Sequence, residues 1–198
     1  GVGSIFMMLE LDQAVVSDPF GDELDSTTTS HTVSRLFSIG RGLQLRLHRE
    51  LLSNNTYSTY LRFDNDSSST DADLTTVVGV NQRFLVEIVF GDGADASRRG
   101  IYVNGTKYST QDIPTASNID WSSSPDMRIG RFPDWNTANP ASTFDYSFSS
   151  FKLGEFLLFN EELSELERQK IEGYLMHKFG IFGALPAGHP YLNSAPIT

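Results

Sequence analysis

The chain has 198 residues, of which 39% are hydrophobic and 12% aromatic, enough large side chains for one well-filled core. Its formal net charge of −10 opposes binding to nucleic acid, whose phosphates need cationic partners. Without cysteine it has no disulfide, thiolate metal ligand or thiol nucleophile, and it has no run of 18 apolar residues to span a membrane. We therefore expect a single globular domain whose partners are neither nucleic acid nor membrane.

Short apolar or alternating segments, separated by turn-forming residues, dominate the first three quarters of the chain. Leucines alternate strictly with polar residues from Leu43 to His48, which is typical of a half-buried strand. Asn104-Gly105 predicts a two-residue hairpin turn, because both residues tolerate positive φ. The pattern predicts an all-β, two-sheet antiparallel sandwich with Greek-key crossings. Its strands are expected over 4–11, 33–39, 43–48, 57–63, 83–90, 99–103, 106–108, 127–132 and 151–159.

One helix is predicted near the C-terminus. Ser164 and Glu167 form the S-x-x-E pattern of a capping box, and Gly180 is placed to end the helix in the left-handed conformation. Apolar residues recur between them at near-helical spacing, so an amphipathic helix is expected to pack on the sandwich. They are Leu166, Ile171, Tyr174, Leu175 and Phe179. Residues 181–198 contain many helix and strand breakers and are expected to form an extended tail.

A long signature covers the same region. It begins with Gly154-Glu155-Phe156-Leu157-Leu158-Phe159-Asn160-Glu161-Glu162-Leu163-Ser164, continues from Glu167 to Gly180, and ends with Leu185-Pro186-Ala187-Gly188-His189-Pro190-Tyr191. It resembles the C-terminal part of concanavalin A-like lectin/glucanase domains of the LamG-like jelly-roll type, found in phage structural proteins and in bacterial extracellular proteins. The segments around Asn104-Gly105 and Ile129-Gly130-Arg131 resemble preceding parts of such domains. The resemblance implies a jelly roll over residues 1–198.

Domains of this kind usually carry further strands before the segment that corresponds to residues 4–11. We therefore expect these 198 residues to be the C-terminal portion of a longer domain or chain. The alternative is that another chain supplies the missing strand by adding it to the sheet.

A glycan-binding region is predicted in the loops after residue 121. Trp135 offers a ring that could stack on a sugar, and Asp134, Asn136 and Asn139 could bind its hydroxyl groups. The structural alternative is that Trp135 fills a gap between a loop and the sheet.

Calcium is the cofactor that the sequence allows, because hard cations take oxygen ligands from acidic loops. The candidate ligands are Asp64, Asn65, Asp66, Asp92 and Asp95, with Asp71 and Asp73 as a further pair. No group matches an EF-hand loop, and Asp and Asn clusters also form turns without binding a metal.

Catalysis is the weaker alternative. Jelly-roll endoglucanases carry an E-x-D-x-x-E pattern, of which Glu10-Leu11-Asp12 supplies the first half, but Val15 stands where the third acid belongs. The four histidines are dispersed, and no hydrolase, zinc-protease or nucleotide-binding motif occurs.

The expected function is accordingly structural or adhesive and not enzymatic. The resemblance favours a phage virion surface protein, as a capsid-decorating or tail component that binds glycans, forms oligomers and contacts other virion proteins. A carbohydrate-binding module of a secreted bacterial protein is the second hypothesis, and a glycan hydrolase is the third.

Overall fold

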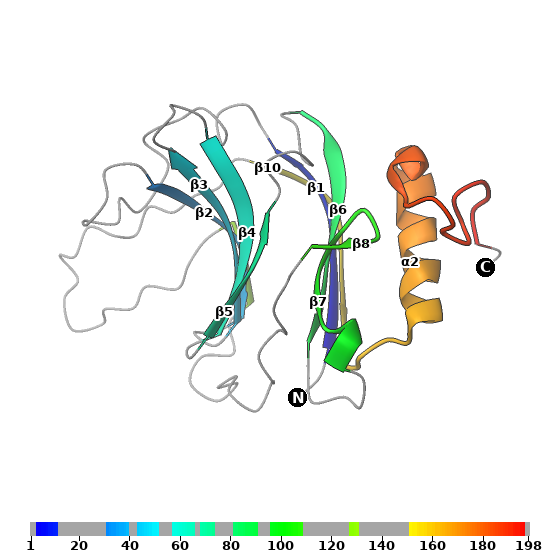
Figure 1. The fold of residues 1–198 in the computed structure, drawn as a ribbon, viewed down its shortest axis with the longest axis horizontal. Coiled ribbons are helices and arrows are strands. Elements are labelled where there is room, and N and C mark those ends of the chain that lie inside the picture. Colours follow the sequence, from blue (N-terminus) through cyan, green and yellow to red (C-terminus); the bar gives the residue numbers. More distant parts are fainter. Residues whose placement is uncertain are drawn as a thin grey trace.

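Two antiparallel β-sheets lie face to face, and one helix covers the outside of one of them (Figure 1). This computed structural model describes residues 3–11, 31–39, 43–51, 57–65, 68–73, 81–90, 96–108, 127–130 and 151–196. The layers follow the order sheet B, sheet A, helix α2 (Figure 1). The predicted all-β sandwich with one C-terminal helix is confirmed.

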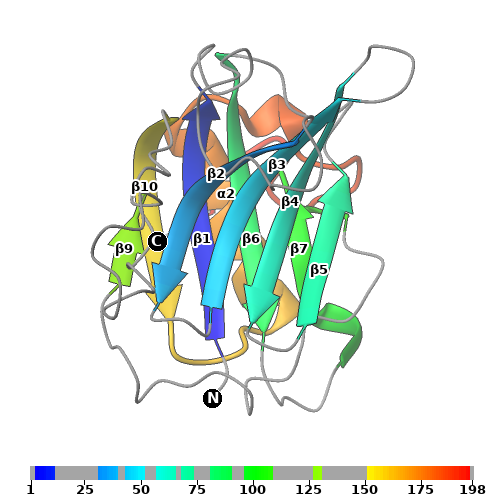
Figure 2. The same ribbon diagram turned by 90° about the vertical axis from the view of Figure 1, so that its left-hand side faces the viewer.

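Each sheet has five described strands. Sheet A has the order β10-β1-β6-β7-β8, formed by Phe151–Phe159, Gly3–Leu11, Arg83–Phe90, Gly100–Val103 and Thr106–Lys107. Sheet B has the order β5-β4-β3-β2-β9, formed by Ser68–Asp73, Tyr57–Asn65, Leu43–Leu51, His31–Ile39 and Met127–Ile129. A 3-10 helix, η1 (Ala96–Arg98), precedes β7. Figure 2 looks onto the outer face of sheet B, with β2 to β5 lying across the front.

The predicted hairpin joins β7 to β8. Asn104 has φ 51° and Gly105 φ 78°, so both turn residues adopt the left-handed conformation that a two-residue hairpin turn requires. The Asn104 side chain also accepts a hydrogen bond from the backbone N–H of Leu85 at 2.9 Å, which fastens the turn to β6. The prediction from Asn104-Gly105 is confirmed.

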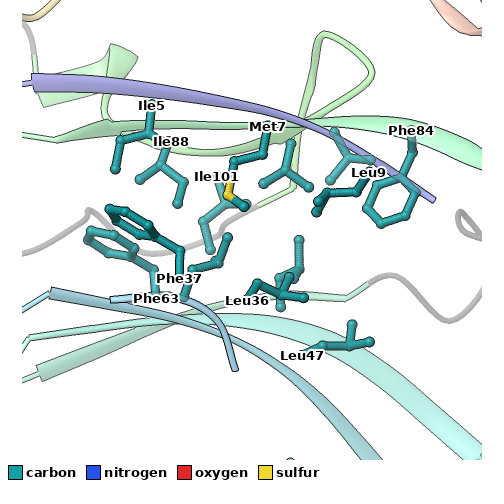
Figure 3. Packing of buried hydrophobic residues seen from close by; sticks show 14 of the residues in the cluster. Ile5, Met7, Leu9, Leu36, Phe37, Leu47, Phe63, Phe84, Ile88 and Ile101 are labelled. Atoms are coloured by element: carbon teal, nitrogen blue, oxygen red, sulfur yellow. The ribbon is translucent and has the colours of Figure 1, made fainter. Parts of the chain in front are cut away.

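Strand β1 is buried on both faces, as its continuous apolar sequence requires. Ile5, Met7 and Leu9 point into the core between the two sheets, where they meet leucines and phenylalanines of sheet B (Figure 3). Phe6 and Met8 point the other way and pack against the helix. Full burial of such a side chain contributes about 1.5–3 kcal/mol, so β1 is the central apolar element of the domain.

Helix α2 (Glu165–Lys178) begins and ends as the sequence predicts. The Ser164 hydroxyl accepts from the backbone N–H of Glu167, and the Glu167 carboxylate accepts from the backbone N–H of Ser164. At the other end Gly180 has φ 73°, and the N–H of Ile181 bonds to the carbonyl of Met176 at 2.9 Å. These contacts form a capping box and a Schellman motif.

The buried face of α2 differs from the predicted one. Leu175 is buried, but Leu166 is 65% exposed and Tyr174 is 39% exposed. Arg168 and Glu172 are buried instead, because an acidic residue of sheet A faces this side of the helix. The spacing of apolar residues therefore predicted the helix correctly, but it predicted part of the buried face of the helix wrongly.

Two further segments are more ordered than expected. The predicted extended tail contains a 3-10 helix, η3 (Phe182–Ala184), and Leu185 and Leu192 pack with α2 against sheet A. The region after Phe63, predicted as a loop, continues as β4 to Asn65 and returns as β5, with Asn65 paired to Ser68. Backbone pairing at a sheet edge explains β5, whose Ser, Thr and Asp residues give no apolar pattern.

Within the described residues, no helix is long and apolar enough to cross a membrane.

Candidate functional site

The outer face of sheet B carries a continuous set of polar and aromatic side chains. It arises because β3 and β4 alternate, sending leucines and Phe63 into the core and the intervening residues outward. We call the described outward side chains the polar face; they are Ser38, Gln44, Arg46, His48, Tyr60, Arg62 and Asp73. The face lies toward the viewer in Figure 2, on the side of the sandwich away from α2.

Strand register arranges the polar face in rows. Ser38 pairs with Gln44, Arg46 pairs with Arg62, and His48 pairs with Tyr60. Directly opposite residues in an antiparallel pair have Cβ atoms about 4.5–5.5 Å apart, so each pair acts as one local surface.

An aromatic stack stands beside the arginines. The His48 and Tyr60 rings are stacked, with centroids 4.9 Å apart and planes inclined by 13°. The Arg62 guanidinium carbon lies 5.4 Å from the Tyr60 ring centroid, within the range of a cation–π contact. Ser38, Gln44 and His48 are buried, whereas Tyr60, Arg46 and Arg62 are half-buried and present part of each side chain outward. The accessible part of the Tyr60 ring can offer a flat apolar plate to a ligand, with the two arginines beside it.

The loop residues predicted to bind glycan are not among those the structure describes. Asp134, Trp135, Asn136 and Asn139 all lie outside the described residues. The glycan-binding loop therefore stays a prediction. The alternation from Gln44 to His48 was the sequence signal for the polar face, since it separates the polar residues from the leucines that fill the core.

The predicted calcium ligands are only partly within the described chain. Asp66, Asp92 and Asp95 lie outside it, and Asp64 and Asn65 are described through their backbone, which ends β4. Asp73 is exposed on β5, where Tyr60 is its partner. Among the described side chains, no group of three or more His, Cys, Asp or Glu residues could hold a metal ion. Calcium binding by this chain stays a prediction.

Glu10, the one described member of the weighed catalytic pattern, is tied into a cationic cluster at the end of sheet A. It accepts from Lys152 at 2.6 Å and from Arg83 at 3.2 Å. The hydrogen bond from Lys152, reinforced by Arg83, lowers the pKa of Glu10. A general acid needs a raised pKa, so this environment opposes the acid role in glycoside hydrolysis. Asp12 lies outside the described residues.

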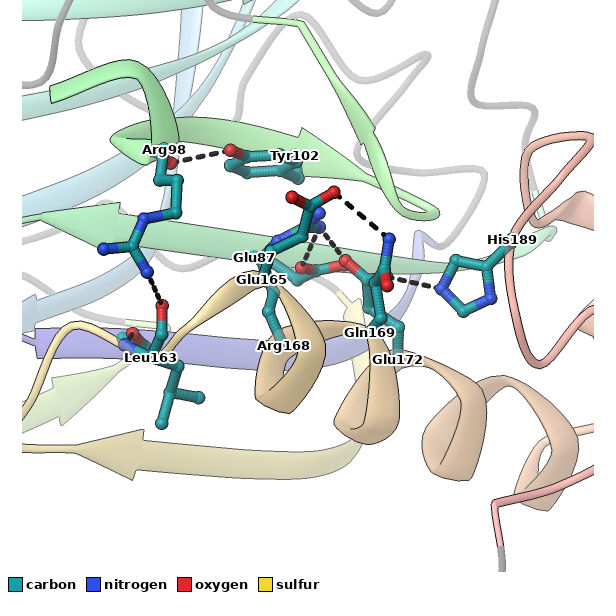
Figure 4. Close-up of polar contacts among 10 residues, drawn as sticks. Glu87, Arg98, Tyr102, Leu163, Glu165, Arg168, Gln169, Glu172 and His189 are labelled. Carbon is teal, nitrogen blue, oxygen red and sulfur yellow. Dashed lines mark hydrogen bonds and ion pairs between the residues drawn. The ribbon is translucent and has the colours of Figure 1, made fainter. Parts of the chain in front are cut away.

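A second group of ionisable side chains lies between sheet A and α2 (Figure 4). Arg168 donates to Glu172 within the helix and reaches Glu87 of β6 at 3.4 Å. Its guanidinium also lies 4.2 Å from the centroid of the Tyr102 ring. The Tyr102 hydroxyl donates to the Arg98 carbonyl at 2.6 Å, and burial raises the pKa of Tyr102 to about 12. We call Glu87, Tyr102, Arg168, Glu172 and His189 the buried cluster.

Protons in the buried cluster can be assigned from its contacts. Nδ1 of His189 accepts from the backbone N–H of Tyr191 at 3.2 Å, which leaves the proton of a neutral ring on Nε2, 2.7 Å from Glu172. Burial, followed by the charge of Glu172, raises the pKa of Glu87 well above its usual range. A protonated Glu87 removes one of the negative charges that would otherwise face each other beside Arg168.

Ionisable groups with shifted pKa values occur at active sites and also in structural networks. Here Glu87 and Glu172 are completely buried, and helix α2 covers them. A substrate could not reach these carboxyls without displacing the helix. The buried cluster therefore holds α2 on sheet A, and the polar face is the better candidate for binding a ligand.

Replacing Glu87 with glutamine, a neutral side chain of the same shape, is expected to flatten the pH dependence of stability. The stability that protonated Glu87 contributes is complete below the unfolded pKa, about 4.3, and is lost as pH rises through the raised folded pKa. Relative to the original protein, the variant should thus gain stability as pH rises above the unfolded pKa. Urea unfolding at several pH values measures this. Glu161→Gln, at an exposed carboxylate, is the control, and equal pH slopes for all three proteins would contradict a protonated Glu87.

Comparison with known proteins supports the fold class. A scan against models of protein families finds no match, and neither does a search of curated proteins. Among solved structures the chain is similar to the native heptameric SAP-like pentraxin from Limulus polyphemus, with a TM-score of 0.53 and 15% identity. The similarity covers 86% of this chain and 69% of the pentraxin. It supports the jelly-roll, lectin-like fold; the narrower LamG-like assignment stays a prediction.

Proposed function

We propose that this domain is a non-catalytic carbohydrate-binding module that holds its ligand on the polar face of sheet B. The observation that carries the proposal is the half-buried Tyr60 ring, with the half-buried side chains of Arg46 and Arg62 in the neighbouring row. Aromatic faces pack on the CH groups of sugars, and fixed polar groups orient their hydroxyls. The lectin-like fold of the solved pentraxin supports the same class of function.

Replacing Tyr60 with alanine should weaken glycan binding at least about tenfold, because it removes the aromatic plate, and ~1.4 kcal/mol corresponds to tenfold. The measurement is a glycan array followed by titration of the strongest ligand. Tyr174→Ala is the matched control, since Tyr174 is an exposed tyrosine on α2, in the layer remote from sheet B. If both variants bind as strongly as the original protein, the glycan binds elsewhere. If no glycan on the array binds, the proposed function is rejected.

Two narrower proposals can be tested in the same assay. Trp135→Ala asks whether the predicted loop contributes to the site, and addition of a chelator asks whether calcium does. If calcium bridges protein and sugar, the chelator should abolish binding and added calcium should restore it.

The place of the domain on a virion surface is a further proposal, supported by the resemblance of its C-terminal signature and by a net charge that keeps many copies soluble. The solved pentraxin is heptameric, and we propose an oligomer for this chain as well. Sedimentation of native source material, followed by mass spectrometry, would find the chain in a large particle on this account. A free monomer would reject both proposals.

A further inference from the structure

A cavity lies beside the C-terminal end of α2, at the end of the domain where β1 also ends (Figure 1). The described residues that line it belong to β1, β6, β10 and the residue that follows α2. Its volume is about 260 Å³. Cavities that hold drug-sized ligands measure about 300–1,000 Å³, so this cavity suits a smaller molecule.

One part of the cavity wall is apolar. Met8, Leu153 and Phe179 line it, and Leu153 and Phe179 are half-buried, so that part of each stays accessible. Gly154 makes room for the aromatic ring, because a Cβ atom at position 154 would lie 2.6 Å from a ring carbon of Phe179. The ring can therefore lie against β10. Apolar surface of this kind takes the hydrocarbon part of a ligand.

The other part of the wall carries two cations and one carboxylate. Glu10 accepts from Nζ of Lys152 at 2.6 Å and from Nε of Arg83 at 3.2 Å. Arg83 also donates from Nη1 to the Phe179 carbonyl at 3.4 Å. Both cations thus have partners, but two positive charges face one negative charge. The side chains of Lys152 and Arg83 are 73% and 52% exposed, and each has N–H donors beyond those used in these contacts.

We propose that this cavity binds a small alkyl carboxylate. The hydrocarbon chain of the ligand packs on Leu153 and Phe179. Its carboxylate accepts from Lys152 and Arg83 and shares these donors with Glu10. The extra positive charge favours an anion over a neutral or cationic molecule of the same shape. The cavity is in the layer of α2, away from the polar face of sheet B, so this inference is independent of the proposed glycan binding.

The probe is octanoate, and octanol and octylamine are the neutral and cationic molecules of the same chain length. A titration of the complete, isotopically labelled chain, followed by NMR, should shift the signals of Leu153, Gly154 and Phe179 when octanoate is added. Octanol and octylamine should bind about three- to fivefold more weakly. Added salt should weaken the binding of octanoate, since the cations are exposed.

Two substitutions should change octanoate affinity in opposite directions. Lys152→Gln removes an exposed positive charge and should weaken binding about two- to fivefold. Glu10→Gln should strengthen binding by a similar factor, because it removes the carboxylate that competes for both cations. Lys170→Gln, at an exposed lysine on α2, is the control and should leave binding unchanged. Thermal unfolding of each variant shows whether it is folded.

The opposite signs separate a site that selects anions from a merely apolar hollow. Octanol that binds as tightly as octanoate would overturn the inference, and so would octanoate binding that Lys152→Gln and Glu10→Gln both leave unchanged. Octanoate that shifts none of the signals of Leu153, Gly154 and Phe179 would also overturn it. The glycan array is a separate measurement, so failure here leaves the proposed glycan binding untouched.

Discussion

Replacing Arg168 with alanine is expected to lower the free energy of unfolding by about 3–5 kcal/mol at pH 7, since removing one partner of a buried ion pair leaves the others uncompensated. Arg168 is the guanidinium of the buried cluster, and it contacts both Glu87 and Glu172. Its loss leaves two buried carboxyl groups facing each other. Since small domains are stable by about 5–15 kcal/mol, this single change would remove a large part of the total.

The loss should shrink at acid pH, where protonation of Glu87, whose pKa is raised, removes one of the buried negative charges. Urea unfolding followed by tryptophan fluorescence measures the difference at pH 5 and pH 7. Lys170→Ala is the matched control, because it removes a cation from the exposed side of the same helix and should change stability by less than about 0.5 kcal/mol. If Arg168→Ala resembled this control, the buried cluster would not be what holds α2 on sheet A.

Gly173→Ala should destabilise the protein by about 1–3 kcal/mol, which reverses the usual effect of this substitution. At a solvent-exposed position inside a helix, alanine is favoured over glycine by about 1 kcal/mol. Here a Cβ atom at position 173 would lie 2.5 Å from the Cβ of Tyr191, which is closer than two carbon atoms can approach. The C-terminal segment would have to move away from α2.

Thermal unfolding gives the overall loss, and hydrogen exchange of residues 181–196 shows whether that segment has separated from the helix. Gly183→Ala is the control, because a Cβ there would meet no atom within 4 Å. A stabilised Gly173→Ala variant would mean that the segment around Tyr191 does not pack closely on the helix.

The features that could be predicted from sequence are those fixed by neighbouring residues. The Asn104-Gly105 turn, the Ser164 cap and the Gly180 end each depend on a few consecutive positions, and each is present as expected. The continuous apolar sequence of β1 likewise indicated cover on both sides. Strand β5 was missed, because its pairing with β4 and not its composition makes it a strand.

The buried cluster depends on contacts that no local pattern contains. Glu87 and Arg168 are 81 positions apart, and their meeting depends on how α2 lies across β6. Spacing along the helix therefore favoured Leu166 as a buried residue and gave no reason to bury Arg168. The polar face has the same origin, since His48 and Tyr60 become neighbours only through strand register.

A titration of the isotopically labelled protein with the tightest-binding glycan of the array, followed through amide and side-chain NMR shifts, tests the proposed glycan-binding surface most directly. We expect the largest shifts at Arg46, His48, Tyr60 and Arg62, with helix α2 unaffected. Shifts confined to the loop around Trp135, or to the surface of α2, would show that the polar face of sheet B is not where the ligand binds.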